Sequence, residues 1–68
     1  MITFTIDTDY IELFKLLKAV HIAESGAAAK ILVENGEVTR NGQPESRKRA
    51  KITKGERISA KGKTIQVL

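Results

Sequence analysis

The chain has 68 residues, with twelve Lys and Arg against eight Asp and Glu, and a formal net charge of +4. Its length fits one small domain, and a composition that is 41% hydrophobic and 29% charged is typical of folded rather than disordered proteins. The absence of cysteine excludes a disulfide scaffold, a thiol nucleophile and a thiolate metal site. No apolar run predicts a membrane-spanning helix and no signal peptide is evident, so we expect a single domain over residues 1–68, in the cytoplasm.

The charge is divided unevenly along the chain. Residues 1–39 contain three lysines against six carboxylates, a net charge of −3, whereas residues 40–68 contain nine cations against two carboxylates, a net charge of +7. A strongly basic half favours an anionic partner, with nucleic acid the leading candidate. The alternative is that the lysines only solubilise strands and protect sheet edges.

The first part of the chain predicts a strand followed by a helix. Apolar residues alternate with threonines from Ile2 to Ile6, as in a short strand. Asp9, followed three residues later by Glu12, resembles an N-cap with its capping-box partner, which predicts an amphipathic helix over Tyr10 to Val20. On this interpretation all three aromatic residues of the chain lie in the core.

A second helix is predicted over Gly26 to Asn35. Ser25 is a good N-cap, and Gly36 suits a left-handed residue at the C-terminus of the helix. The run Ile31 to Val33 is expected to supply the buried stripe.

The remainder of the chain predicts strands and turns. A strand at 37–40 is followed by the turn signal Asn41-Gly42, and Pro44 prevents a long central strand from following directly. Residues 43–51 are therefore expected to form an exposed arm, and strands are expected at 57–60 and 64–68. The predicted fold is α+β: two helices packed on one face of a small, mostly antiparallel sheet that includes an extra N-terminal strand.

Catalysis has little support in the sequence. His21 is the only imidazole, and no carboxylate is placed to orient it. The chain lacks a cluster of metal ligands and a glycine-rich phosphate loop, and its serines have no partner constellation. We therefore expect a protein that is not an enzyme, with no cofactor, no metal and no small-molecule substrate.

Two features fit nucleic-acid binding. The first is the start of the second helix, where Ser25 and Gly26 offer backbone N–H groups to an anion and Lys30 lies on the same face; the alternative is an ordinary cap with a solvated lysine. The second is the arm, where four of the five residues 47–51 are basic; the alternative is a solubilising loop. With every aromatic residue expected in the core, no platform for stacking bases is predicted, so binding would depend on phosphates and ribose.

Taken together, these elements resemble a known family. The chain contains, in this order, Ser25-Gly26-Ala27-Ala28-Ala29-Lys30, a helix end and strand over 31–38, Arg40-Asn41-Gly42, a basic run and Lys54-Gly55-Glu56. This order and spacing resemble the RNA-binding domain of the small-subunit ribosomal protein S-four type, also called the alpha-L motif, in the form of its small stand-alone bacterial members. The resemblance runs from about Asp9 to Ile58 and implies two helices and a hairpin that cradle structured RNA.

The resemblance implies contacts at both features and at the hairpin. By position, the implied RNA-binding residues are Ser25, Gly26, Lys30, Arg40, Asn41, Arg47, Lys48, Arg49 and Lys51. The chain departs from the family pattern at Ile11-Glu12-Leu13, where many members have Arg-Leu-Asp, and at Gly26, where many have Arg. Both departures remove a cation from the expected surface.

We therefore expect a monomeric module that binds structured RNA, such as ribosomal or transfer RNA, and no membrane. The alternatives are an adaptor that docks an acidic protein through the basic arm and a DNA-binding protein without sequence preference.

Overall fold

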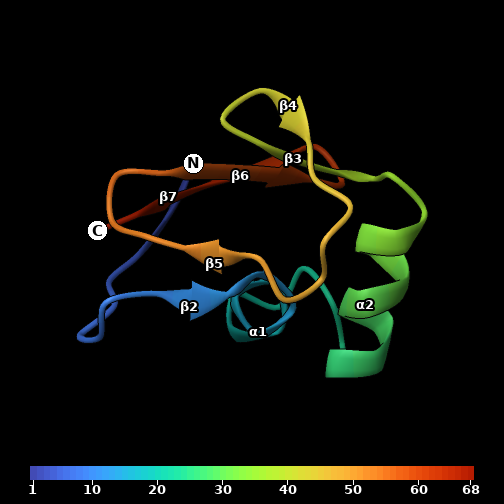
Figure 1. Cartoon of the computed structure of the whole chain (residues 1–68), viewed down its shortest axis with the longest axis horizontal. Coiled ribbons are helices and arrows are strands. Elements are labelled where there is room, and N and C mark those ends of the chain that lie inside the picture. Colours follow the sequence, from blue (N-terminus) through green and yellow to red (C-terminus); the bar gives the residue numbers. More distant parts are fainter.

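The computed structural model describes the whole chain, residues 1–68, as two helices, a five-stranded sheet and a separate two-stranded ladder (Figure 1). The elements in chain order are β1 (Ile2–Phe4), β2 (Ile11–Glu12), α1 (Leu13–Ala19), α2 (Gly26–Glu34), β3 (Val38–Arg40), β4 (Gln43–Pro44), β5 (Lys51–Ile52), β6 (Arg57–Ala60) and β7 (Lys63–Val67). The predicted α+β class is confirmed, with short extra strands β2, β4 and β5.

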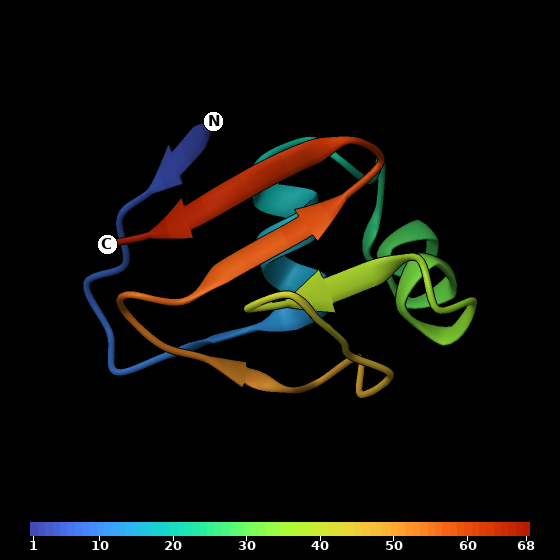
Figure 2. The ribbon, with the colours of Figure 1, turned by 90° about the horizontal axis from the view of Figure 1, so that it is seen from above.

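The main sheet has the strand order β1-β7-β6-β3-β4. Only β1 and β7 pair in parallel; the other three pairs are antiparallel. The extra N-terminal strand of the prediction is therefore confirmed as an edge strand beside the C-terminal strand. Seen from above, α1 lies beneath the sheet and α2 lies to one side of it (Figure 2).

One hydrophobic core joins the sheet to α1. It contains 16 buried residues, among them Leu13, Leu16 and Leu17 of α1, none of which has measurable exposure. The spacing of these three leucines places them on one helical face, which packs over the inward residues Ile58 and Ile65 of the sheet. These two residues are directly paired across β6 and β7.

The start of the first helix was predicted wrongly. Asp9 is not its N-cap, and α1 begins at Leu13, with Glu12 in the cap position but making no side-chain cap bond. The first N–H groups of the helix instead donate to the arm: Leu13 N–H to the carbonyl of Ala50 at 2.9 Å and Phe14 N–H to that of Lys48 at 3.0 Å. Because carbonyls distant in sequence satisfy these donors, the local capping box is not needed.

Residues 10–12 are extended rather than helical as a result. Ile11 pairs with Ile52, and Glu12 pairs with Lys51, in the β2–β5 ladder. Alternation along a strand turns Ile11 toward the core and its two neighbours outward. Tyr10 was predicted to lie in the core and is 42% exposed.

The second helix begins at Gly26 as predicted, but it ends at Glu34 rather than at Asn35. The Ser25 hydroxyl accepts a hydrogen bond from Ala28 N–H at 3.1 Å, and Gly36 has a left-handed φ of 75°. Ile31, however, was predicted in the buried stripe and is 55% exposed, because the inward face is formed by Ala29, Leu32 and Val33.

The predicted turn at Asn41-Gly42 is confirmed. Both residues have positive φ, 51° and 84°, as a two-residue hairpin loop between β3 and β4 requires. Pro44 lies in β4 at the edge of the sheet, where its missing N–H costs no ladder bond. Residues 43 and 44 thus belong to the sheet, and the arm proper is the segment 45–51.

Neither helix has the length and apolar character needed to cross a membrane.

Candidate nucleic-acid interface

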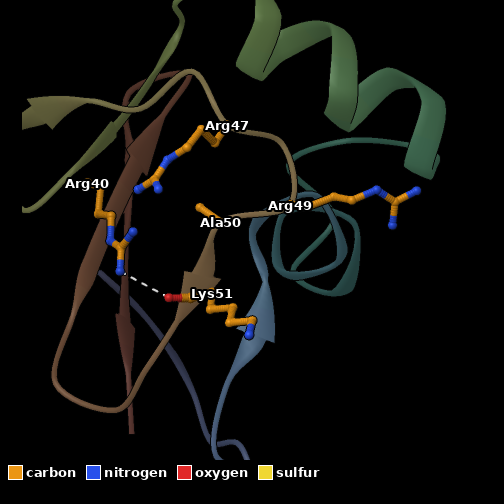
Figure 3. A pocket seen from close by; sticks show the side chains of 5 residues that line it. All are labelled: Arg40, Arg47, Arg49, Ala50 and Lys51. Carbon is orange, nitrogen blue, oxygen red and sulfur yellow. Dashed lines mark hydrogen bonds between the residues drawn. The ribbon is translucent and has the colours of Figure 1, made fainter.

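Basic side chains of the hairpin and the arm gather around one hollow of about 460 Å³. It is lined by Arg40, Arg47, Arg49, Ala50 and Lys51 (Figure 3). Four of these five residues are cations, and they come from two segments, the end of β3 and the arm with its continuation into β5. The fold therefore brings four of the nine cations of residues 40–68 to the rim of one hollow, with the Arg49 side chain directed away from Arg40 and Arg47.

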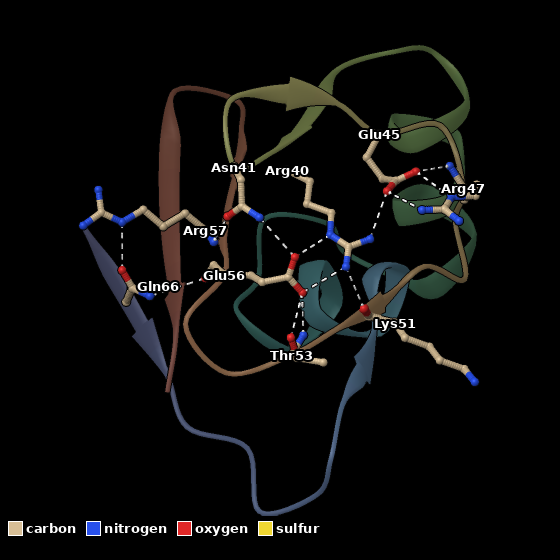
Figure 4. A network of polar contacts seen from close by, with 9 residues as sticks. All are labelled: Arg40, Asn41, Glu45, Arg47, Lys51, Thr53, Glu56, Arg57 and Gln66. Atoms are coloured by element: carbon tan, nitrogen blue, oxygen red, sulfur yellow. Dashed lines mark hydrogen bonds and ion pairs between the residues drawn. The ribbon is translucent and has the colours of Figure 1, made fainter.

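Arg40 is the most constrained cation of this hollow (Figure 4). Its guanidinium donates to both carboxylate oxygens of Glu56, at 2.6 and 3.0 Å, to Glu45 Oε1 at 3.2 Å, and to the backbone carbonyl of Lys51 at 3.0 Å. These bonds use four of the five N–H groups of the side chain. Arg40 thereby joins β3, the arm, β5 and the turn before β6.

The two carboxylates of this network are strongly acidic. Hydrogen bonding from Arg47, with further bonds from its backbone and from Arg40, lowers the pKa of Glu45 from 4.5 to about 2, against the opposing effect of burial. Hydrogen bonding from Arg40, assisted by Thr53, lowers the pKa of Glu56 to about 2 in the same way. Both groups stay ionised near neutral pH, and the same pairing raises the pKa of Arg40.

Asn41 serves the same network from the hairpin turn. Its Oδ1 accepts from Arg57 N–H at 2.9 Å, and its Nδ2 donates to Glu56 Oε1 at 3.1 Å. Its positive φ also suits asparagine better than most residues. The structure therefore gives this predicted contact residue partners inside the protein.

The arm carries more open cations, although most of them are paired with carboxylates. Arg47 bonds to Glu45 at 3.1 Å with its side chain 73% exposed, and Lys48 bonds to Glu34 of α2 at 2.9 Å with its side chain 43% exposed. Arg49 lies 3.5 Å from Glu12, at the long limit of a hydrogen bond. The arm is not a free loop, because Ala50 and Glu45 are buried at its two ends.

The start of α2 meets the arm around a single aromatic ring. The ammonium of Lys30 lies 4.7 Å, and the guanidinium of Arg49 5.2 Å, from the centre of the half-buried Phe14 ring. Gly26 packs against the edge of the same ring, where an added Cβ would lie 3.6 Å from it. The structure thus brings Gly26 and Lys30 next to the arm, while the Ser25 hydroxyl is occupied as the helix cap.

Sequence reasoning missed the carboxylates and the aromatic residues of this surface. Glu45 was treated only as a charge and Glu56 only as part of the Lys54-Gly55-Glu56 motif, although both carboxylates bond to Arg40. The exposure of Tyr10 could have been found from the alternation of Tyr10, Ile11 and Glu12 if the segment had been considered as a strand. No group of three or more His, Cys, Asp or Glu side chains is placed to hold a metal ion.

The geometry agrees with comparisons to known proteins. The family model of the S4 domain matches residues 4–68. The chain belongs to the S4 domain family. YbcJ from Escherichia coli strain K12 is 42% identical over 69 residues, covering 100% of this chain and 99% of that protein, and YbcJ from Shigella flexneri matches to the same extent.

A solved structure supports the same assignment. The solution structure of Escherichia coli YbcJ superposes with a TM-score of 0.77 at 42% identity, covering 100% of this chain and 87% of that one. That structure is described as revealing an alfaL motif involved in RNA binding. The resemblance inferred from the motif order is confirmed at the level of the family and the fold.

Proposed function

We propose that this protein is a non-enzymatic module that binds structured RNA, such as ribosomal or transfer RNA, through phosphate and ribose contacts. The observation that carries the proposal is the hollow lined by four cations, Arg40, Arg47, Arg49 and Lys51. A concave surface with more cations than carboxylates attracts an anion and accommodates a curved backbone better than scattered lysines do. The S4 domain family and the description of the YbcJ structure support RNA as the polyanion.

The proposed contact residues divide into two groups. Arg47, Lys48, Arg49 and Lys51 would bind phosphates directly, because their side chains reach solvent along the arm. Lys30 would join them from α2, beside the backbone of Ser25 and Gly26. Arg40 and Asn41 would act mainly by shaping the hollow, because most of their polar groups already bond to the protein.

A salt titration tests the proposal. When cations neutralise phosphates, log affinity falls linearly with log salt concentration, with a slope of about −0.7 per phosphate on single strands and steeper on helices. We expect steep salt dependence for a stem-loop RNA, one protein bound per RNA, and weaker binding of a polypyrimidine strand of equal length. The measurement is fluorescence anisotropy with labelled RNA at several salt concentrations.

The two alternatives predict different outcomes. A DNA-binding protein without sequence preference would bind duplex DNA as tightly as the stem-loop. An adaptor for an acidic protein would bind the stem-loop and the polypyrimidine strand no more tightly than it binds a generic polyanion such as heparin. Either result, or equal affinity for the stem-loop and the polypyrimidine strand, would remove the proposal.

A further inference from the structure

A second hollow adjoins the first across the β2–β5 ladder. It has a volume of about 320 Å³ and is lined by Thr8, Tyr10, Ile11, Glu12 and Lys15. Its size falls at the lower end of the range of small-ligand sites. Figure 1 shows β2 and β5 side by side, and Glu12 of this hollow is the direct ladder partner of Lys51, which lines the first one.

The ladder register explains why an aromatic ring is exposed here. Ile11 and Ile52 pair on the face that packs on the core, so Tyr10 and Lys51 lie on the opposite face as diagonal neighbours. The Lys51 ammonium lies 5.1 Å from the centre of the Tyr10 ring. Tyr10 remains 42% exposed, and its backbone carbonyl accepts from the Thr8 hydroxyl at 2.9 Å, which fixes the chain just before the ladder.

The chemistry of this pair matches one nucleotide. A nucleotide carries an anionic phosphate and a flat base, and the site offers a partly exposed aromatic ring with a cation over it. Bases within an RNA helix cannot reach such a ring, whereas unpaired bases in loops and bulges are displaced from the stack and settle on aromatic side chains. The cationic hollow alongside would hold the flanking phosphates.

We propose that Tyr10 is a stacking platform for one unpaired base of the bound RNA, with Lys51 on the adjacent phosphate. The inference rests on the RNA binding proposed above and adds base contact to a surface that would otherwise bind only the backbone. Such a base contact would make the protein bind stem-loops and bulged helices more tightly than uninterrupted duplexes.

The test uses the stem-loop RNA of the salt titration and versions of it in which each loop nucleotide in turn is replaced by an abasic nucleotide. The abasic nucleotide keeps the phosphate and the sugar and removes only the base. We expect one of these replacements to weaken wild-type binding by about 5- to 150-fold, the range for loss of one stacked base. In Tyr10→Leu, which keeps an apolar side chain without a π face, the same replacement should have no effect, and Tyr10→Phe should restore the wild-type difference.

A spectroscopic readout locates the contact. Tyr10 is the only tyrosine of the chain, so incorporation of 3-fluorotyrosine gives a single ¹⁹F resonance at this site. The resonance should shift when the intact stem-loop binds and shift much less with the critical abasic version. Because Tyr10 is exposed, the Leu variant should keep the wild-type melting temperature, which separates loss of stacking from loss of fold.

Two outcomes overturn the inference in distinguishable ways. If wild type binds the stem-loop but Tyr10→Leu shows the same dependence on the loop bases, Tyr10 is only a partner for Lys51, and RNA binding itself stands. If wild type binds no stem-loop, the proposed function and this inference fail together.

Discussion

Arg40 and Arg47 both bond to Glu45, but they differ in exposure to solvent and in the number of hydrogen-bond acceptors around them. The Arg40 side chain is 24% exposed and has Glu45, Glu56 and a backbone carbonyl as acceptors. The Arg47 side chain is 73% exposed and has only Glu45. The number of acceptors around each guanidinium, rather than the residue type, decides whether it holds the fold together or remains available to a partner.

The same difference separates two regions of the surface. Around the turn of the β3–β4 hairpin, the polar groups of Arg40, Asn41 and Glu56 bond to one another. Along the arm, exposed ion pairs are worth about 0–1 kcal/mol each, so a phosphate can compete for these cations. One region should therefore respond to substitution through stability, and the other through RNA affinity.

The largest expected effect on binding comes from the arm. Replacing Arg47, Lys48, Arg49 and Lys51 together by Gln should reduce RNA affinity by about 100-fold or more and flatten the salt slope by up to about four phosphates. Melting temperature should change little, because the pairs of Lys48 and Arg49 are exposed and the buried Glu45 keeps Arg40 as its partner when Arg47 is replaced. Anisotropy titrations and thermal melts measure the two quantities.

A matched variant controls for net charge. Replacing the exposed lysines Lys18, Lys54, Lys61 and Lys63 by Gln removes the same four charges from other parts of the surface. If both variants lose affinity equally, the arm contributes only bulk charge.

Substitution of Arg40 should act mainly on stability. Arg40→Gln leaves Glu45 and Glu56 without their shared cation in a half-buried position, and we expect a loss of about 2–4 kcal/mol in the free energy of unfolding, measured by urea denaturation. Arg40→Lys should lose less, because it keeps the charge without the bidentate fork. A Gln variant as stable as wild type would contradict the network's role.

The same network predicts a pH dependence of stability. The pKa values of Glu45 and Glu56 are about 2 in the folded protein against an ordinary value of 4.5, so between these values the unfolded chain binds more protons. Their contribution is complete above about pH 5 and is lost progressively as the pH falls toward 2. Urea denaturation across this range should show the fall, and Arg40→Gln should make it shallower.

A single substitution at α2 gives the smallest effect. Lys30→Gln should reduce the salt slope by about one phosphate and weaken binding accordingly, without unfolding the protein. Lys63→Gln on β7 serves as its matched control and should leave the slope near that of wild type. If the two variants have the same salt slope and RNA affinity, the start of α2 is only a helix cap and does not contact RNA.

The elements that sequence reasoning predicted well carry local signals. The second helix has its cap at Ser25 and its left-handed end at Gly36, and the hairpin has Asn41-Gly42, the residue types that these backbone conformations require. Such signals act within a few residues and need no knowledge of the rest of the chain.

The wrong predictions concern segments whose local structure depends on contacts with residues distant in the sequence. The start of α1 depends on carbonyls of the arm, and the strand at Ile11–Glu12 depends on pairing with Lys51–Ile52, about 40 residues further on. Asp9 and Glu12 matched a capping box, and nothing local excluded it. For the candidate site, the sequence located the cations but could not show that Glu45 and Glu56 would engage Arg40, because that depends on how the arm folds back.

The two carbonyls that the arm presents to α1 have a consequence for its length. Surface loops ordinarily tolerate insertions and deletions, but here the Lys48 and Ala50 carbonyls must stay in register with the amides of Phe14 and Leu13. Adding or removing a residue between these carbonyls would misplace at least one of them and leave the helix start uncapped. An engineer who wished to redirect this protein to another RNA would therefore have to exchange side chains on a segment of fixed length.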